Sequence, residues 1–177
     1  MTIKNKIFKL IQKKNISQLK KLIIDNKNYN FNISNNNITL IEYILNYSYY
    51  DILKILLEKN TRIDITDNDG RCLLYTPIKL NDNNILELLL KYNQKNIGID
   101  ITNIKDKNGK YPIHYCVEFN NLTALKLLIK YNANIQSIDN DNNNILHLAG
   151  YNKNYEIIKF LISKYDNLNK FNDIGEN

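Results

Sequence analysis

Few residues in this sequence are of types that could carry out chemistry. Cys116 lies two positions after His114, and such a pair could supply a thiol nucleophile with a neighbouring base. The second histidine, His147, could join His114 in holding a metal ion, because imidazole is a common metal ligand. Each possibility depends on the elements that carry these side chains and on the direction in which those elements turn them.

Other signatures of catalysis or cofactor binding are weaker. Asp64, Asp67 and Asp69 superficially resemble a calcium loop, but the ligand order and the closing glutamate are missing, so a solvated turn is the better interpretation. The glycines never cluster as a phosphate-binding loop requires. They are Gly70, Gly98, Gly109, Gly150 and Gly175. We therefore expect a protein that is not an enzyme and has no cofactor and no metal site.

The sequence repeats with a period of 33 residues, and this period accounts for both histidines. His114 and His147 occupy the same position in successive repeats. Cys116 occupies the position that Ala149 fills one repeat later, which indicates a small core-facing residue rather than a nucleophile. Further pairs at this spacing are Asp106 and Asp139, Leu128 and Leu161, and Ile113 and Leu146.

We expect one domain over residues 1–177. Its units fall approximately at 1–33, 34–66, 67–105, 106–138 and 139–171, with a partial unit at 172–177. The third unit carries about six extra residues between Lys91 and Lys105. Because the partial unit provides no cap, the apolar flank of Ile157, Ile158 and Leu161 should be exposed. We expect a monomer, or weak association through that flank.

Each unit has a polar turn, a short first helix, a polar break and a second helix. The fourth position of the turn always holds a residue that adopts positive φ cheaply. These residues are Asn37, Gly70, Gly109, Asn142 and Gly175. The helices are at or below the roughly 12 residues needed for marginal stability alone, so they must stack. The apolar column that should form the buried spine is Ile23, Leu56, Leu89, Leu128 and Leu161.

The unit that begins at Asp106 shows the pattern most clearly. It contains Gly109, Pro112, His114 and Leu128. This pattern resembles the ankyrin repeat, in which an aspartate and a glycine open the turn and a proline and a histidine begin the first helix. The resemblance extends over essentially the whole chain. It implies an all-α solenoid of stacked helix-turn-helix units joined by β-turn or hairpin loops, with the histidines in structural hydrogen bonds.

Several positions depart from the ankyrin pattern. The threonine of the family is replaced by Cys72, Tyr111 and Asn144, and the histidine column holds Glu42 and Tyr75 in the earlier units. We expect the hydrogen bonds that join neighbouring turns to be weaker or different there. Pro77 falls in the middle of the first helix of its unit, where proline removes a donor and clashes with the preceding turn. We therefore predict a distorted or shortened helix around Thr76 and Pro77.

The resemblance implies that the protein binds another protein through the concave face formed by turns and first helices. Aligning the units places Tyr47, Leu80 and Phe119 at one exposed position, with Tyr151 beside it. Apolar anchors surrounded by polar residues are typical of binding hot spots. The turn tips would form the polar rim of this site. They are Asn68, Asp69, Arg71, Lys107, Asn108, Lys110, Asn140 and Asp141.

The net charge of +6 belongs to one end of the chain. Residues 1–33 hold eight lysines against Asp25 alone, a local charge of +7. This basic unit offers an alternative function, attachment to nucleic acid or to an acidic surface. We consider nucleic acid the weaker partner because no arginine accompanies the lysines. The chain lacks a membrane-spanning run, so we expect an intracellular, cytoplasmic protein. The composition suggests an AT-rich genome, such as that of a large DNA virus, with the host cytoplasm as the location.

Overall fold

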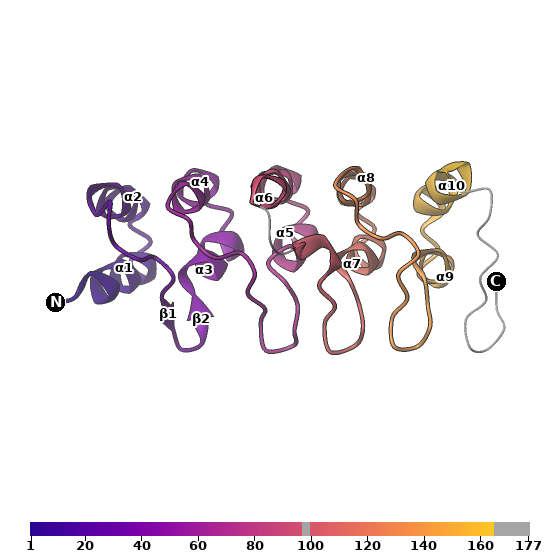
Figure 1. Cartoon of the computed structure of the whole chain (residues 1–177), viewed down its shortest axis with the longest axis horizontal. Coiled ribbons are helices and arrows are strands. Elements are labelled where there is room, and N and C mark those ends of the chain that lie inside the picture. Colours follow the sequence, from indigo (N-terminus) through magenta and orange to yellow (C-terminus); the bar gives the residue numbers. More distant parts are fainter. Residues whose placement is uncertain (97–99, 165–177) are drawn as a thin grey trace. The chain divides into compact units, whose positions relative to one another are not determined.

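The computed structural model of the chain describes residues 1–96 and 100–164. Within these ranges its elements are α-helices apart from one short hairpin and one 3-10 turn, which confirms the predicted all-α class (Figure 1). The chain divides into two compact units, Met1–Arg62 and Ile63–Asn177.

The first unit contains two helix pairs and the hairpin. Its elements are α1 (Ile3–Gln12), α2 (Ile16–Asp25), β1 (Ser34–Asn35), β2 (Ile38–Thr39), α3 (Leu40–Asn46) and α4 (Tyr50–Glu58). The helices α1 and α2 pack on each other, as do α3 and α4, and α2 packs on α4. Ile23 and Leu56 are fully buried, as the spine column predicted. Phe8 meets Tyr43 edge-on, with ring centroids 5.7 Å apart.

The helix α3 shows how the first unit manages without the family's histidine. The backbone N–H of Thr39 donates to the Glu42 carboxylate at 2.7 Å, and the backbone N–H of Glu42 donates to the Thr39 hydroxyl at 3.3 Å. This reciprocal capping box satisfies two amides at the helix N-terminus. Glu42 therefore supplies the local acceptor that histidine supplies in later units.

The second unit arranges its helices in two rows. Its elements are α5 (Tyr75–Lys79), α6 (Asn83–Lys95), the 3-10 turn η1 (Ile101–Asn103), α7 (Pro112–Glu118), α8 (Leu122–Lys130), α9 (Ile145–Tyr151) and α10 (Tyr155–Lys164). Figure 1 shows α5, α7 and α9 in one row, α6, α8 and α10 in the other, and the turn loops extending beyond the first row. Leu89, Leu128 and Leu161 are fully buried, which confirms the predicted spine.

The positive-φ column is confirmed at every position that the structure describes. The φ angles are +62° at Asn37, +83° at Gly70, +74° at Gly109 and +58° at Asn142. The predicted fifth member, Gly175, lies outside the described residues, as does the partial unit at 172–177. The sequence pattern therefore located the turns correctly because it followed a backbone conformation that few residue types tolerate.

The insertion and Pro77 make the start of the second unit irregular, as predicted. The helix α6 has 13 residues where α8 has 9. The turn η1 follows it in the inserted segment, and its residue Ile101 is fully buried. The helix α5 has five residues where α7 has seven. It begins at Tyr75, which places Pro77 in its first turn, where the missing donor has no intrahelical partner to lose. The shortened helix thus accommodates the proline.

The expectation of an exposed apolar flank at the last helix pair is wrong for two of its three residues. Ile157 and Leu161 are fully buried, because α10 packs against α9, and Ile158 is half-buried. The large hydrophobic residues of α10 that are exposed are Tyr155, at 73%, and Ile162, at 57%.

Candidate interaction surface

The residues considered for chemistry are structural. Both cysteines are buried and unpaired. Burial raises the pKa of the Cys72 thiol to about 12, and burial likewise raises the pKa of the Cys116 thiol well above its usual range. Neither thiol is activated as a nucleophile, since a reactive cysteine needs a lowered pKa. Among the described residues, no group of three or more His, Cys, Asp or Glu side chains could hold a metal ion.

The two histidines form the structural hydrogen bonds that the resemblance implied. The backbone N–H of Tyr111 donates to Nδ1 of His114 at 3.0 Å, and Nε2 of His114 lies 3.2 Å from the Ser137 carbonyl oxygen. In the next unit the backbone N–H of Asn144 donates to Nδ1 of His147 at 3.2 Å. His114 therefore joins the start of α7 to the loop that precedes the next turn.

We predict that His114 makes stability depend on pH. Burial lowers the pKa of His114 below its ordinary value of 6.5, although the nearby Asp139 carboxylate opposes this shift. The folded state therefore prefers the neutral ring. The contribution of His114 to the free energy of unfolding is complete above pH 6.5. It falls as the pH drops below that value, because the unfolded state then takes up a proton more readily than the folded state. In urea denaturation, the midpoint of the wild type should exceed that of His114→Gln most at pH 7.5. That gap should narrow toward pH 5, and a constant or widening gap would contradict the prediction.

The turn loops of the second unit share one hydrogen-bonding pattern around an aspartate. The Asp67 Oδ1 atom accepts from the backbone N–H groups of Asp69 and Arg71, each at 2.9 Å. The Asp106 and Asp139 carboxylates make the same pair of bonds two and four residues ahead, at 2.8 to 3.0 Å. An aspartate that holds backbone donors in this way fixes a turn locally. The predicted rim residues are therefore presented on ordered loops.

Neighbouring turn loops are also bonded to each other. The backbone N–H of Lys107 donates to the Asp69 carbonyl, and that of Asn140 donates to the Asn108 carbonyl, both at 3.0 Å. The Asn140 side-chain amide adds a bond to the Lys107 carbonyl at 3.1 Å. Three successive turns thus form one bonded series. The rim residues predicted from different repeats are brought together along it.

The first helices and the turn before them bring together four side chains, Arg71, Tyr75, Tyr115 and Phe119, which we call the aromatic row. The Arg71 guanidinium carbon lies 4.2 Å from the centroid of the Tyr75 ring. Tyr75 meets Tyr115 edge-on at 4.8 Å, and Tyr115 stacks on Phe119 at 6.2 Å between centroids. Each aromatic pair is worth about 0.5 to 1.5 kcal/mol beyond its buried area. Tyr115 is 7% exposed and the other three members are half-buried, so the row is a packed cluster whose outer members reach the surface.

Tyr115 ties the aromatic row to the turn. Its hydroxyl donates to the buried Asp106 carboxylate, which also accepts the backbone bonds described above. Burial and this hydrogen bond raise the pKa of Tyr115 well above its ordinary value. The phenol therefore stays protonated, and the row keeps its position relative to the turn.

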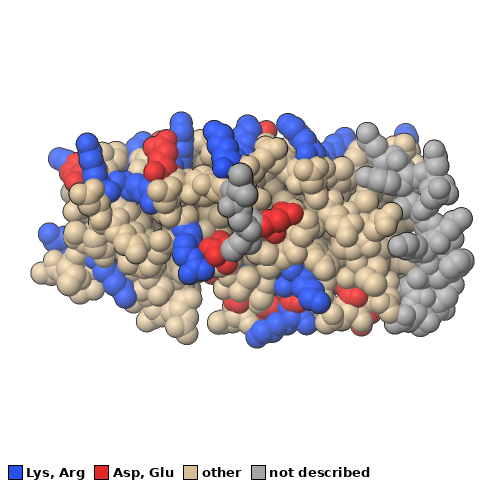
Figure 2. Space-filling model, in the orientation of Figure 1, with Lys and Arg blue, Asp and Glu red and all other residues tan. Residues whose placement is uncertain are grey.

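Charged side chains surround the aromatic row. Arg71 pairs with Asp67 at 2.8 Å and with Asp69 at 2.7 Å, and Lys110 pairs with Glu118 at 2.7 Å. In Figure 2 the turn edge of the second unit carries both signs of charge, whereas the edge of the second helices carries mainly basic side chains. The rim therefore offers donors and acceptors together, which suits specific recognition of a protein surface more than general attraction to polyanions.

The predicted anchors lie at the C-terminal ends of first helices. Leu80 and Phe119 are the C-caps of α5 and α7, and Tyr151 is the last residue of α9. Leu80 and Tyr151 are 49% and 53% exposed, whereas Phe119 is half-buried against Tyr75. Within the second unit the anchors follow the first helices and the rim precedes them, and the aromatic row includes one residue of each set, the anchor Phe119 and the rim residue Arg71.

Tyr47 belongs to the first unit and is described there alone. It is the C-cap of α3, is 50% exposed, and stacks on Tyr49 with ring centroids 5.6 Å apart. Alignment of the repeats had placed it in line with Leu80 and Phe119. That alignment stays a prediction.

Tyr75 and Tyr115 were not among the site residues predicted from the sequence. Tyr75 stands in the histidine column and was interpreted as a departure from the pattern, whereas Tyr115 stands at a position where the pattern specifies no residue type. A signal was present in the spacing of Tyr115 and Phe119, since aromatic residues four positions apart lie on one helix face. No such local signal joins Tyr75 to Tyr115, which meet only when α5 packs on α7.

Comparison with known proteins adds two findings. Residues 94–172 match the family model described as ankyrin repeats in three copies. The chain is 34% identical over 169 residues to a putative ankyrin repeat protein of Acanthamoeba polyphaga mimivirus. The alignment covers 93% of this chain and 22% of that relative, so the chain spans about a fifth of the relative's length.

Among the described residues, no helix is long and apolar enough to cross a membrane.

Proposed function

Since the chain is an ankyrin repeat protein, a class that generally mediates protein–protein interactions, we propose that it is a non-catalytic scaffold or adaptor. Its binding surface is the face that the first helices and turn loops of the second unit build. The observation that carries this proposal is the aromatic row, in which the half-buried side chains of Arg71, Tyr75 and Phe119 are held together with the buried Tyr115 ring. Aromatic and arginine side chains dominate the energetics of protein interfaces.

Two features of the surface support a protein as its partner. The side chains of Leu80 and Tyr151, at the C-terminal ends of α5 and α9, are exposed, and exposed apolar groups with a polar surround mark interaction sites. The bonded turns hold the rim in place before binding, which reduces the entropy lost on association. The identity of the partner is a question for capture experiments.

We also propose that the protein acts in the cytoplasm of a virus-infected cell. The aligned relative is viral, and the two buried, unpaired cysteines suit a reducing compartment. Imaging of a fluorescently tagged chain in infected cells tests this proposal. Exclusion of the tagged chain from the cytoplasm would contradict it.

We predict that the double variant Leu80→Arg/Tyr151→Arg loses its protein partner. Both side chains are exposed, so the fold should tolerate the change, while two added charges should weaken binding at least about tenfold. The measurement is affinity capture from cell extract, with quantification of each protein that the wild type retains.

A matched control separates this surface from general stickiness. Tyr155 and Ile162 are 73% and 57% exposed but belong to α10, a second helix, so Tyr155→Arg/Ile162→Arg should keep the partner. Equal capture by the wild type and by both variants would contradict the proposed surface. In the same capture experiment, the variant Tyr47→Arg tests separately whether the first unit contributes to binding of the partner.

A further inference from the structure

The first unit contains a hollow between α1 and α2 that the proposed surface does not use. Its volume is about 610 Å³, within the range of roughly 300 to 1,000 Å³ that is typical of ligand sites. The residues that line it are Met1, Lys6, Lys9, Leu10, Lys13, Asn15, Gln18, Lys21, Leu22 and Asp25. We call this feature the basic groove.

Helical spacing explains why these residues share one groove. Lys6 and Lys9 of α1 and its C-cap residue Lys13 lie three and four positions apart, so they share one face of that helix. The lining residues of α2 follow the same spacing of three or four positions. They are Gln18, then Lys21 and Leu22, then Asp25. The core-facing residues of both helices, such as Ile7 and Ile23, fall at other positions and are fully buried. The groove is therefore a second face of the helix pair, distinct from the one that forms the core.

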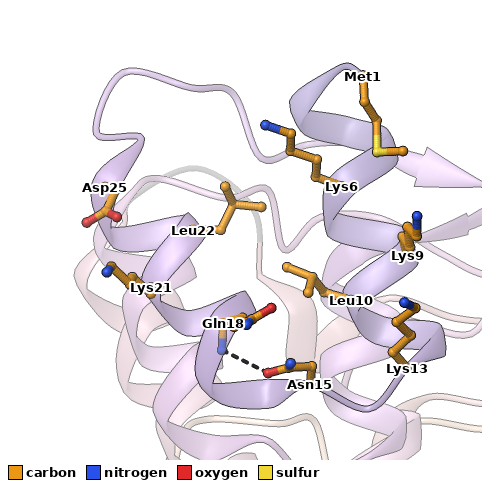
Figure 3. Close-up of a pocket in the computed structure, with 10 residues that line it drawn as sticks. All are labelled: Met1, Lys6, Lys9, Leu10, Lys13, Asn15, Gln18, Lys21, Leu22 and Asp25. Atoms are coloured by element: carbon orange, nitrogen blue, oxygen red, sulfur yellow. Dashed lines mark hydrogen bonds between the residues drawn. The ribbon is translucent and has the colours of Figure 1, made fainter.

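The groove has an apolar floor and basic walls. Figure 3 shows Leu10 and Leu22 pointing into the gap between the helices, with lysines along the α1 side and Lys21 on the α2 side. Both leucines are half-buried. At the end of the gap, Asn15 caps α2 by accepting from the backbone N–H of Gln18 at 3.2 Å. The two walls are thus held by regular helices.

The charge of the groove is not balanced within the protein. Four lysines line it and Asp25 is the one carboxylate among the lining residues. Among the ion pairs of the described residues, none includes Lys6, Lys9, Lys13 or Lys21, whereas Lys20 nearby pairs with Asp51 at 3.0 Å. The four ammonium groups are therefore available to a ligand that brings negative charge.

We infer that the basic groove binds an acidic amphipathic helix of a partner protein. Carboxylates on one side of such a helix complement the lysines, while its apolar side chains cover Leu10 and Leu22. The helix-in-groove mode uses apolar anchors at helical spacing, and opposite charges steer the encounter and set the register. A ten-residue helix is about 15 Å long, so α1 and α2 match about three turns of such a ligand.

Other occupants fit the groove less well. Nucleic acid offers phosphates but gains little from a leucine floor, and the ten lining residues include neither an arginine nor an aromatic ring on which a base could stack. A second copy of this chain has a net charge of +6, which would add repulsion to the lysines. The acidic helix is the partner that uses both the charge and the floor.

The test uses a synthetic peptide of about 15 residues with Glu on one helical face and Leu on the adjoining face. Binding to the full chain is measured by fluorescence anisotropy. The pair Lys6→Glu/Lys21→Glu should weaken binding at least about tenfold, because like charges then oppose the peptide. The floor variant Leu22→Gln should also weaken it, and circular dichroism verifies the fold of each variant.

The control pair is Lys4→Glu/Lys54→Glu, which changes the net charge equally outside the groove. Both lysines are exposed residues of the first unit, and Lys54 occupies the repeat position that Lys21 fills one unit earlier. Binding by this pair should stay within about threefold of the wild type, because neither side chain lines the groove and salt weakens the effect of exposed charges that do not contact the ligand. Equal loss in both pairs, or no binding of the peptide to the wild type, overturns the inference.

Three comparison ligands decide between peptide and polyanion. They are a scrambled peptide of the same composition, a single-stranded DNA of matched charge, and vesicles that contain phosphatidylserine. Preference for the amphipathic peptide supports the inference. Equal binding of the scrambled peptide, or tighter binding of DNA or vesicles, overturns it. The Leu80→Arg/Tyr151→Arg variant should bind the peptide normally, so failure here is distinct from failure of the proposed function.

Discussion

Replacing Gly109 with alanine is expected to destabilise the protein by about 3 kcal/mol, because the new methyl group meets both conformational strain and a steric clash. Gly109 has φ of +74°, a region that L-residues with a side chain rarely adopt. A Cβ atom there would lie 2.7 Å from the backbone nitrogen of Asn140 and closer still to the Asn140 side chain. Since Asn140 belongs to the neighbouring turn, the substitution should strain the bonded series of turns.

Two other glycines provide controls for this prediction. Gly150 lies in α9, and a Cβ atom added there would have no neighbouring atom within 4 Å, so Gly150→Ala should be neutral or stabilise by about 0.5 to 1 kcal/mol. A Cβ atom at Gly70 would have its nearest neighbour at 3.2 Å, so Gly70→Ala should fall between the two. The measurement is urea denaturation followed by circular dichroism. Equal midpoints for Gly109→Ala and Gly150→Ala would contradict the prediction.

Leu128→Ala is expected to cost about 2 to 5 kcal/mol, the range measured for truncating a buried leucine. Leu128 is fully buried in α8, and α8 packs against both α6 and α7. The removed carbons would leave a cavity that helices fixed on two sides cannot readily fill. The loss should therefore lie toward the upper part of the range.

Ile162→Ala is the matched control for Leu128→Ala. It removes a similar apolar volume from a helix of the same unit, but Ile162 is 57% exposed. Its free energy of unfolding should change by no more than about 0.5 kcal/mol. If the two variants had the same midpoint of denaturation, Leu128 could not be part of a close-packed spine.

The fold and the proposed function depend on the same turns. Gly109 stands between Asn108 and Lys110, two of the predicted rim residues, and Asp106 anchors both the turn and the Tyr115 hydroxyl. A substitution that strains the turn should therefore also displace the aromatic row. Binding variants at exposed positions avoid this coupling, so a loss of capture there reports on contact rather than on folding.

The repeat pattern predicted most of the fold from the sequence. A period of 33 located the turns at Asn37, Gly70, Gly109 and Asn142, because positive φ restricts the residue types that can stand there. It assigned Cys116 and the histidines to structural positions, because each has a counterpart one repeat away. Pro77 indicated a short helix through a constraint that acts within a few residues. All of these properties follow from local sequence.

The interaction surface and the basic groove required the tertiary structure. Tyr75 and Tyr115 are 40 positions apart and meet only because α5 packs on α7. The sequence identified lysines at one end of the chain, but only the packing of α1 on α2 encloses Leu10 and Leu22 between them. Local backbone preferences and periodic burial are therefore determined by the sequence itself. The surfaces are decided by which helices become neighbours, because contacts between distant side chains leave no periodic trace in the chain.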